Sequence, residues 1–291
     1  MKTTKILSQY NLDVDEEAVK KAISEITEKA KALKSQESLK QILSFIDLTT
    51  LSERDNTDKA KRFAKNVSEF SAKFPNYSNV AAICVYPELV KDVRENVKVD
   101  NFSLASVVGG FPASQTLIEI KQAETEAAIN AGATEADMVI SVGKFLAEDY
   151  DTVFEEINKI KESCGENHLK VILETGALPS LKAIKTASVL GIEAGGDFIK
   201  TSTGKIDVSA TPEAMYIMAQ TVKEYYDRTG KKIGLKPAGG ISDADTAMIY
   251  YAIVKEVLGS DWLSPEFFRI GASSLANKVL SELEGREVSY F

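Results

Sequence analysis

The sequence predicts an α/β fold, a (β/α)8 TIM barrel of eight parallel strands with an N-terminal helical extension. Three observations carry this prediction: eight short apolar segments recur along the chain, amphipathic helical stretches separate them, and 291 residues suit one such barrel. Strict alternation of strands and helices implies that the strands are parallel. Periodicity by itself leaves an open, doubly wound sheet as the alternative.

An N-terminal helical lead-in comes before the first apolar segment. Residues 12–44 carry apolar side chains at helical spacing, from Val19 to Leu33, after an acidic start. We therefore expect residues 1–40 to form this lead-in and residues 41–291 to form the barrel as one domain.

The strand candidates are compact apolar runs, and the stretches between them are long enough for crossover helices. The eight strand candidates are residues 45–48, 80–86, 104–108, 138–141, 169–173, 198–200, 233–236 and 267–270. The clearest helix candidates are residues 119–131, 153–163, 181–194, 212–228 and 244–258.

Composition excludes several classes of function. A net charge of -8 argues against a nucleic-acid surface, which needs clustered basic residues. With two cysteines, Cys84 and Cys164, and one histidine, His168, we expect no disulfide framework and no metal site. We find no signal peptide or membrane-length apolar run, and so predict a cytoplasmic protein that binds no membrane. The sequence leaves a homo-oligomer open.

Two lysines occupy unusual places at the ends of predicted strands. Lys200 follows Phe-Ile and Lys236 follows Gly-Leu, and a glycine-containing turn comes soon after each. Burial lowers the pKa of a lysine, and a neutral lysine is a nucleophile that forms Schiff bases. A shift of two pKa units needs about 3 kcal/mol. A second ammonium about 5 Å away, across neighbouring strands, supplies about that much at an effective dielectric near 20. A lysine that only snorkels from a strand end is the alternative for each.

Active sites of such folds lie beyond the carboxyl ends of the strands. The candidate side chains that the pattern places there are Asp47, Cys84, Asp137, Glu174, Lys200 and Lys236. Asp137 is suited to general acid and base catalysis, with a strand cap or surface ion pair as the alternative. Asp47 suits the orientation of substrate hydroxyls or of a catalytic lysine, and a turn cap is an equal alternative. Cys84 fits a buried apolar position better than a reactive thiol.

Glycine and hydroxyl turns follow the last two strand candidates. Gly239-Gly240 and Gly271-Ala-Ser-Ser274 offer backbone N–H groups in the two loops where barrel enzymes often bind phosphate. The alternative is that these glycines belong to ordinary loops that bind no phosphate. Gly204-Lys205 lacks the other residues of a Walker A loop, and no dinucleotide glycine fingerprint follows an early strand.

Five segments in this order resemble the deoxyribose-phosphate aldolases, a family of class I aldolases on a TIM barrel: Ile46-Asp-Leu-Thr-Thr-Leu51, Ala82-Ile-Cys-Val-Tyr-Pro87, Phe198-Ile-Lys-Thr-Ser-Thr-Gly-Lys205, Lys236-Pro-Ala-Gly-Gly240 and Arg269-Ile-Gly-Ala-Ser-Ser274. The resemblance covers residues 41–276. It implies reversible cleavage of 2-deoxy-D-ribose 5-phosphate to acetaldehyde and D-glyceraldehyde 3-phosphate by a carbon–carbon lyase without cofactor or metal. The expected partners are therefore a small sugar phosphate and aldehydes.

The resemblance also implies a role for each matching residue. Lys200 would form the Schiff base, Lys236 would lower its pKa, and Asp137 would relay protons. The residues expected to bind substrate are Asp47, Thr203, Gly204, Lys205, Gly239, Gly240, Gly271, Ser273 and Ser274. Another class I Schiff-base aldolase or a transaldolase is the alternative enzyme, and a silent sugar-phosphate binding protein is the alternative from another class.

The chain departs from the family pattern at several positions. Ser242 stands where many relatives carry an arginine near the phosphate, Leu235 where phenylalanine is usual, and Ser114 where glycine is frequent. The tail ends in Tyr290-Phe291, and in some relatives a terminal tyrosine reaches the active site. For this chain a disordered tail is the stronger expectation.

Overall fold

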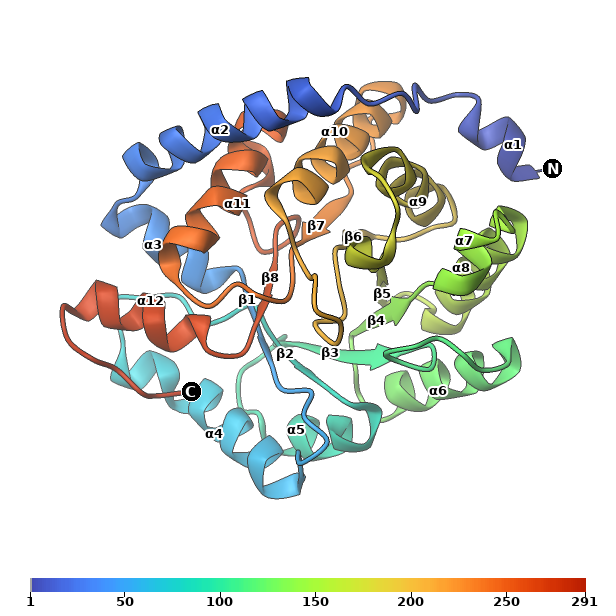
Figure 1. Cartoon of the computed structure of the whole chain (residues 1–291). Helices are drawn as coiled ribbons and strands as arrows, with labels where there is room; N and C mark the ends of the chain where they lie inside the picture. The colour runs from blue at the N-terminus through green and yellow to red at the C-terminus, as the bar shows by residue number, and fades with distance from the viewer. Residues whose placement is uncertain (1) are drawn as a thin grey trace.

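Eight parallel strands form a ring at the centre of the molecule in the computed structural model, which describes residues 2–291. The strands follow the order β7-β6-β5-β4-β3-β2-β1-β8, and helices surround them (Figure 1). Two isolated parallel bridges, Leu235 to Phe268 and Ala238 to Gly271, close the ring between β7 and β8. The predicted (β/α)8 barrel is confirmed, and the open sheet is excluded.

The strands are short and almost wholly buried: β1 Ile46–Thr49, β2 Ala82–Val85, β3 Ser103–Val108, β4 Glu135–Val139, β5 His168–Ile172, β6 Phe198–Lys200, β7 Gly234–Lys236 and β8 Ile270–Ala272. Each overlaps its predicted segment, but β4 begins three residues earlier than expected and β8 is displaced toward its carboxyl end. The apolar pattern misplaced β4 because Glu135 and Asp137 are charged, although both point into the barrel.

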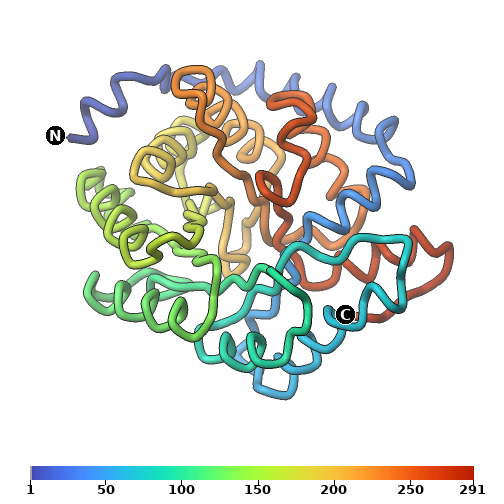
Figure 2. The backbone as a smooth tube through the Cα atoms, turned by 180° about the vertical axis from the view of Figure 1, so that it is seen from behind, coloured from blue at the N-terminus to red at the C-terminus, as the bar shows by residue number. Residues whose placement is uncertain are grey.

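The helices that cross between strands lie on the outside of the ring (Figures 1 and 2). The α-helices are α1 Lys2–Leu7, α2 Glu16–Leu33, α3 Gln36–Ser44, α4 Thr57–Lys73, α5 Val90–Asn96, α6 Ile118–Asn130, α7 Val142–Leu146, α8 Tyr150–Cys164, α9 Leu181–Glu193, α10 Pro212–Thr229, α11 Ala244–Leu258 and α12 Leu275–Glu284. Three short 3-10 turns are η1 Pro87–Leu89, η2 Thr175–Ala177 and η3 Ser260–Trp262.

The predicted N-terminal helix is divided in two. Ser35 ends the run by forming a capping box with Ser38, in which each hydroxyl accepts from the other residue's backbone N–H, so α3 starts anew. Helix α2 buries Val19 and Ile23 along one face and packs across α10 and α11 (Figure 2). The boundary near residue 40 between lead-in and barrel stays a prediction.

The expectation of a disordered tail is wrong. The Tyr290 hydroxyl donates to the backbone carbonyl of Asn66 at 2.6 Å, and the Phe291 ring stacks on Phe70 at 5.6 Å between centroids. Asn277 Oδ1 accepts from the backbone N–H groups of both tail residues, at 2.8 and 3.0 Å. Aromatic burial therefore anchors the tail against α4 and α12, where the chain ends in Figure 1.

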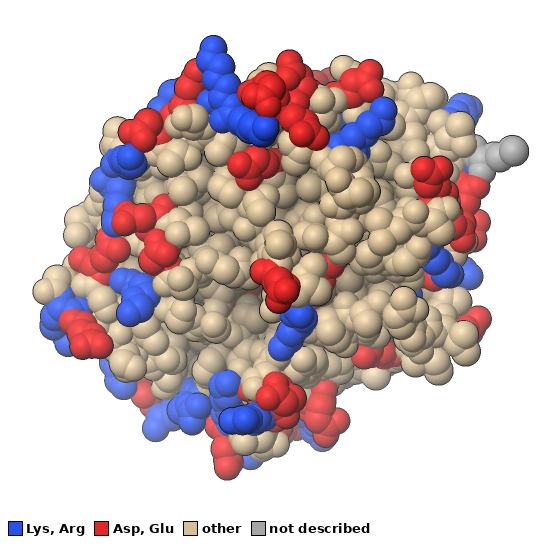
Figure 3. Space-filling model, in the orientation of Figure 1, with Lys and Arg blue, Asp and Glu red and all other residues tan. Residues whose placement is uncertain are grey.

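Charged side chains of both signs share the rim of the face in Figure 3, whereas the middle of this face is mostly uncharged. Among residues 2–291, none of the helices combines the length and the apolar composition that crossing a membrane requires.

Candidate active site

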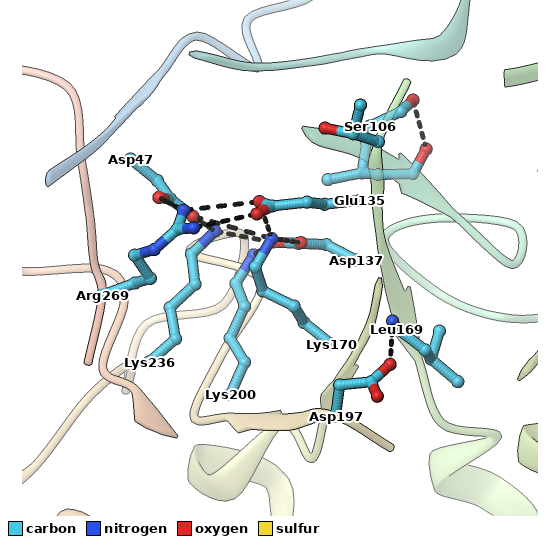
Figure 4. Close-up of polar contacts among 12 residues, drawn as sticks. Asp47, Ser106, Glu135, Asp137, Leu169, Lys170, Asp197, Lys200, Lys236 and Arg269 are labelled. Atoms are coloured by element: carbon cyan, nitrogen blue, oxygen red, sulfur yellow. Dashed lines mark hydrogen bonds and ion pairs between the residues drawn. The ribbon is translucent and has the colours of Figure 1, made fainter. Parts of the chain in front are cut away.

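Seven ionisable side chains from five strands and the segment before β8 converge inside the barrel (Figure 4). They are Asp47, Glu135, Asp137, Lys170, Lys200, Lys236 and Arg269. Strand register brings them together, because Lys200 pairs with Lys236 across β6 and β7, and Asp137 pairs with Lys170 across β4 and β5. Side chains of paired residues on neighbouring parallel strands share one face of the sheet.

Asp137 joins the two predicted catalytic lysines. Its Oδ2 lies 2.8 Å from Lys200 Nζ and 2.7 Å from Lys236 Nζ. The Lys236 ammonium also lies 2.5 Å from Oδ2 of Asp47. The prediction that both lysines enter one site therefore holds, although Asp137 and Asp47 sit within strands rather than at the expected strand ends.

The surroundings shift the pKa values of the two lysines in opposite directions. Burial lowers the pKa of Lys200 below its usual value, and the Lys236 ammonium lowers it further, against the opposing effect of Asp137. Lys236 is equally buried, yet Asp137 and Asp47 outweigh that burial and raise its pKa. Burial, rather than the neighbouring ammonium that the sequence argument relied on, is the largest cause of the lowered pKa of Lys200. The same surroundings therefore shift the two lysine pKa values in opposite directions, so Lys200 gives up its proton more readily than Lys236.

Asp137 stays ionised despite complete burial. Burial favours the neutral acid, but Lys170, Lys200 and Lys236 hold its pKa well below its usual value. A carboxylate that accepts from both amines is placed to take a proton from a group bound at Lys200 and to return one.

Sequence reasoning missed three members of the cluster. Lys170 Nζ lies 2.5 Å from Glu135 Oε2 and 2.9 Å from Asp137 Oδ1, and Arg269 lies 2.9 Å from Glu135 Oε1 and 2.7 Å from Asp47 Oδ1. The available signal was a charged residue in the middle of a buried apolar run, as Lys170 is in Leu-Lys-Val-Ile-Leu.

The aromatic ring of Phe198 lies next to this cluster on β6. The cationic groups of Lys170 and Arg269 each lie 5.9 Å from its centroid. The facing residue of β7 is Gly234, where a Cβ would meet the ring at 2.2 Å. Glycine is therefore required at this position to leave room for Phe198.

A cleft of about 280 Å³ opens above the lysine pair. Most of the predicted substrate-binding residues line it, and so does the predicted catalytic lysine: Lys200, Thr203, Gly204, Lys205, Gly239, Gly240, Gly271, Ser273 and Ser274. Helix α12 begins directly after Ser274, so its first turn of N–H groups lies at the edge of this cleft. The cleft thus joins a buried amine to a rim suited to an anion.

Loop contacts hold the rim in place. Thr203 donates its hydroxyl to Glu174 Oε2 at 2.5 Å, and Lys205 Nζ donates to the backbone carbonyl of Leu51. Gly239 has φ +83°, and a Cβ there would lie 2.6 Å from Ser209 and 3.2 Å from the Gly204 backbone. Glycine therefore permits the two phosphate-side turns to approach each other.

Asp47 and Cys84 lie beneath the cleft. Asp47 is fully buried and contacts Lys236 and Arg269, which favours its holding a catalytic lysine over its orienting substrate hydroxyls. Burial raises the pKa of Cys84, so this thiol is a buried apolar group rather than a nucleophile. Within residues 2–291, no three His, Cys, Asp or Glu side chains are grouped to hold a metal ion.

The family model described as DeoC/LacD family aldolase matches residues 41–277. The chain belongs to this family. The human protein named deoxyribose-phosphate aldolase is 39% identical over 271 residues, covering 87% of this chain and 84% of that protein. The mouse protein of the same name is 38% identical, with the same coverage of both chains.

A solved structure of another aldolase has the same fold. The deoxyribose phosphate aldolase from Aeropyrum pernix, described as a unique tetrameric structure, is 25% identical with a TM-score of 0.68, and the likeness covers 89% of this chain and 97% of that chain. Within the DeoC/LacD aldolase family, the present chain combines one buried lysine of lowered pKa and one of raised pKa with a cleft whose lining includes Ser242.

Proposed function

We propose that this chain is a deoxyribose-phosphate aldolase that reversibly cleaves 2-deoxy-D-ribose 5-phosphate to acetaldehyde and D-glyceraldehyde 3-phosphate. The observation that carries the proposal is the buried amine of Lys200, whose pKa is lowered and which lines a cleft rimmed by glycine and hydroxyl turns. The family match and the names of the curated relatives support the choice of reaction.

The reaction begins with attack of the neutral Lys200 amine on the aldehyde carbon of the opened sugar. The resulting carbinolamine loses water and becomes an iminium, whose positive charge accepts electrons from the neighbouring bond. Removal of the proton from the C3 hydroxyl lets the C2–C3 bond break. The electron pair of that bond then forms an enamine on Lys200, and D-glyceraldehyde 3-phosphate leaves.

Asp137 and Lys236 serve the proton transfers in this scheme. Asp137 Oδ2 accepts from both amines, so it can receive a proton from the carbinolamine stage and return one to the enamine. Protonation of the enamine carbon and hydrolysis of the iminium then release acetaldehyde. Lys236 remains a cation throughout and disfavours protonation of Lys200.

The phosphate of the substrate would occupy the rim of the cleft. Backbone N–H groups of the turns at Gly204 and Gly239 and the start of α12 supply partners for its oxygens, whereas Gly271 lies in β8 and donates its N–H to the carbonyl of Pro237. Lys205 is the cation on this side, and Ser273 and Ser274 add hydroxyls.

Trapping with acetaldehyde and sodium borohydride tests the proposal. We expect an ethyl group on Lys200 in the peptide map, with Lys236 and Lys205 unmodified. Lys200 lines the cleft with a lowered pKa, Lys236 is kept an ammonium by Asp137 and Asp47, and the Lys205 amine donates to the carbonyl of Leu51. A Lys200 adduct formed with a ketone donor but not with acetaldehyde would instead favour a transaldolase or another class I aldolase. No adduct with either would favour a silent binding protein.

Ser242→Arg is expected to lower the KM for the phosphorylated sugar. Ser242 lines the cleft beside the turn at Gly240, so an arginine there would add a second cation near the phosphate. A charge-assisted hydrogen bond of about 1.5 kcal/mol corresponds to a roughly tenfold lower KM. Steady-state kinetics would measure it, with unphosphorylated 2-deoxyribose as the control whose kinetics should not change. An unaltered KM for the phosphorylated sugar would refute this account of Ser242.

A further inference from the structure

Three charged side chains lie beneath the catalytic lysines, and the proposed reaction gives them no step. Glu135, Lys170 and Arg269 are 2%, 0% and 5% exposed, respectively. Each contacts at least one partner of opposite charge within 3.0 Å. Buried charges are unfavourable unless they are paired, so three of them in a barrel interior call for a physical role.

The interior charges balance only when Lys200 is neutral. Besides Lys200, the interior holds three carboxylates and three cations, which we call the charge layer: Asp47, Glu135 and Asp137; Lys170, Lys236 and Arg269. Neighbouring cations lower the pKa of every carboxylate in the layer, and neighbouring carboxylates raise the pKa of every cation. All six therefore stay charged and cancel, so a proton on Lys200 would add an unbalanced charge.

We propose that Glu135, Lys170 and Arg269 are positioning residues that complete this charge balance and thereby make Lys200, rather than Lys236, the amine that stays uncharged. The inference rests on the proposed function, since it concerns the amine that would form the Schiff base.

Contact geometry supports this selection. Lys236 lies within 2.7 Å of two carboxylates, Asp47 and Asp137, and Lys170 lies within 2.9 Å of Glu135 and Asp137. Among the residues described, Lys200 contacts one carboxylate, Asp137, and shares it with both other lysines. The amine with the smallest share of negative charge is the one that gives up its proton.

The groups that face Lys200 come from several strands. Asp137 on β4 favours its ammonium, Lys236 on β7 opposes it, and Cys84 on β2 is a neutral thiol. Lys170 on β5 acts through the other oxygen of Asp137. Since Lys170 and Lys200 bind opposite oxygens of one carboxylate, their charges lie within about 8 Å, where removing one shifts the other's pKa by on the order of one unit.

Two opposite substitutions and their combination test the charge balance. Trace acetylation with acetic anhydride across a pH series, read on the Lys200 peptide by mass spectrometry, measures the free amine without any sugar or turnover. We expect Lys170→Met to shift the acetylation profile of Lys200 upward by about one pH unit, because it leaves an excess negative charge. Glu135→Gln should shift the profile downward, because it leaves an excess positive charge.

The double variant Lys170→Met/Glu135→Gln restores neutrality and should return the profile to that of the wild type. A lysine deletion that acted only by disrupting packing would not be rescued by a second deletion. The matched control is Lys121→Met, since Lys121 is also fully buried and lies 3.0 Å from a carboxylate, Glu156, but outside the charge layer. It should lower the Tm and leave the Lys200 profile in place.

Single variants that shift in the same direction, or a double variant that does not return to the wild-type profile, would overturn the inference. If Lys170→Met does not fold, an unshifted profile for Glu135→Gln alone is sufficient to overturn it. The outcome is separate from that of the proposed function. Failure of acetaldehyde trapping removes the aldolase assignment. Successful trapping, together with variants whose Lys200 acetylation profiles are unshifted, removes only the proposed role of the charge layer in setting the pKa of Lys200.

Discussion

Replacing Lys200 by methionine is expected to reduce aldol cleavage to the uncatalysed level while leaving the fold intact. Without the amine no iminium forms, and the electrons of the C2–C3 bond have no acceptor. Assays of acetaldehyde release and borohydride trapping would both read zero. Lys236 should not substitute as nucleophile, because Asp137 and Asp47 keep it an ammonium.

Stability separates this loss from misfolding. Lys200 is buried and burial lowers its pKa, so methionine removes an unfavourable buried amine and leaves the six opposite charges cancelling. We therefore expect a Tm equal to or above that of the wild type. Activity or a borohydride adduct retained in the Lys200→Met variant would show that another residue is the nucleophile.

The Asp137→Asn variant is expected to lose about 10²- to 10⁴-fold in kcat, the usual range for removing a general acid or base. The amide keeps the shape but can no longer accept a proton. Since Asp137 is the group that favours the Lys200 ammonium, its removal lowers the pKa of Lys200 further, and more free amine is present at lower pH. We therefore expect acetaldehyde adducts to form while turnover is slow.

Asp197→Asn is the matched control for Asp137→Asn. Asp197 also pairs with a lysine, Lys161 at 2.7 Å, and accepts from the Leu169 backbone, but it points away from the two catalytic amines in Figure 4. It should alter stability alone. An Asp137→Asn enzyme with wild-type kcat and an unmoved pH profile would remove Asp137 from the proton relay.

Much of the fold and part of the site could be predicted from the sequence. The apolar runs alternate with amphipathic stretches, so the barrel and most strand positions follow from periodicity. Lys200 and Lys236 stood out because each ends a short apolar run, and the structure places both in one site. The turns at Gly204 and Gly239 were visible as glycine and hydroxyl loops after those strands.

Other features were hidden from sequence reasoning for a physical reason. Glu135 and Arg269 interrupt apolar runs and suggest strand boundaries, yet they are buried because they neutralise each other across the barrel. The residues just before Tyr290 are polar and show no periodicity, so the sequence pattern does not predict that the tail packs on α4. This packing depends on aromatic partners more than 200 residues away.

The sequence by itself determined the alternation of strands and helices, the family, and which two lysines matter. Only the tertiary structure decided which surrounding groups shift the pKa values of these lysines in opposite directions. A pKa depends on which charges surround a group in space, and parallel strand register gives Lys236 two carboxylates and Lys200 a share of one. Contacts between residues far apart in the chain therefore set the chemistry of two lysines that look alike in sequence.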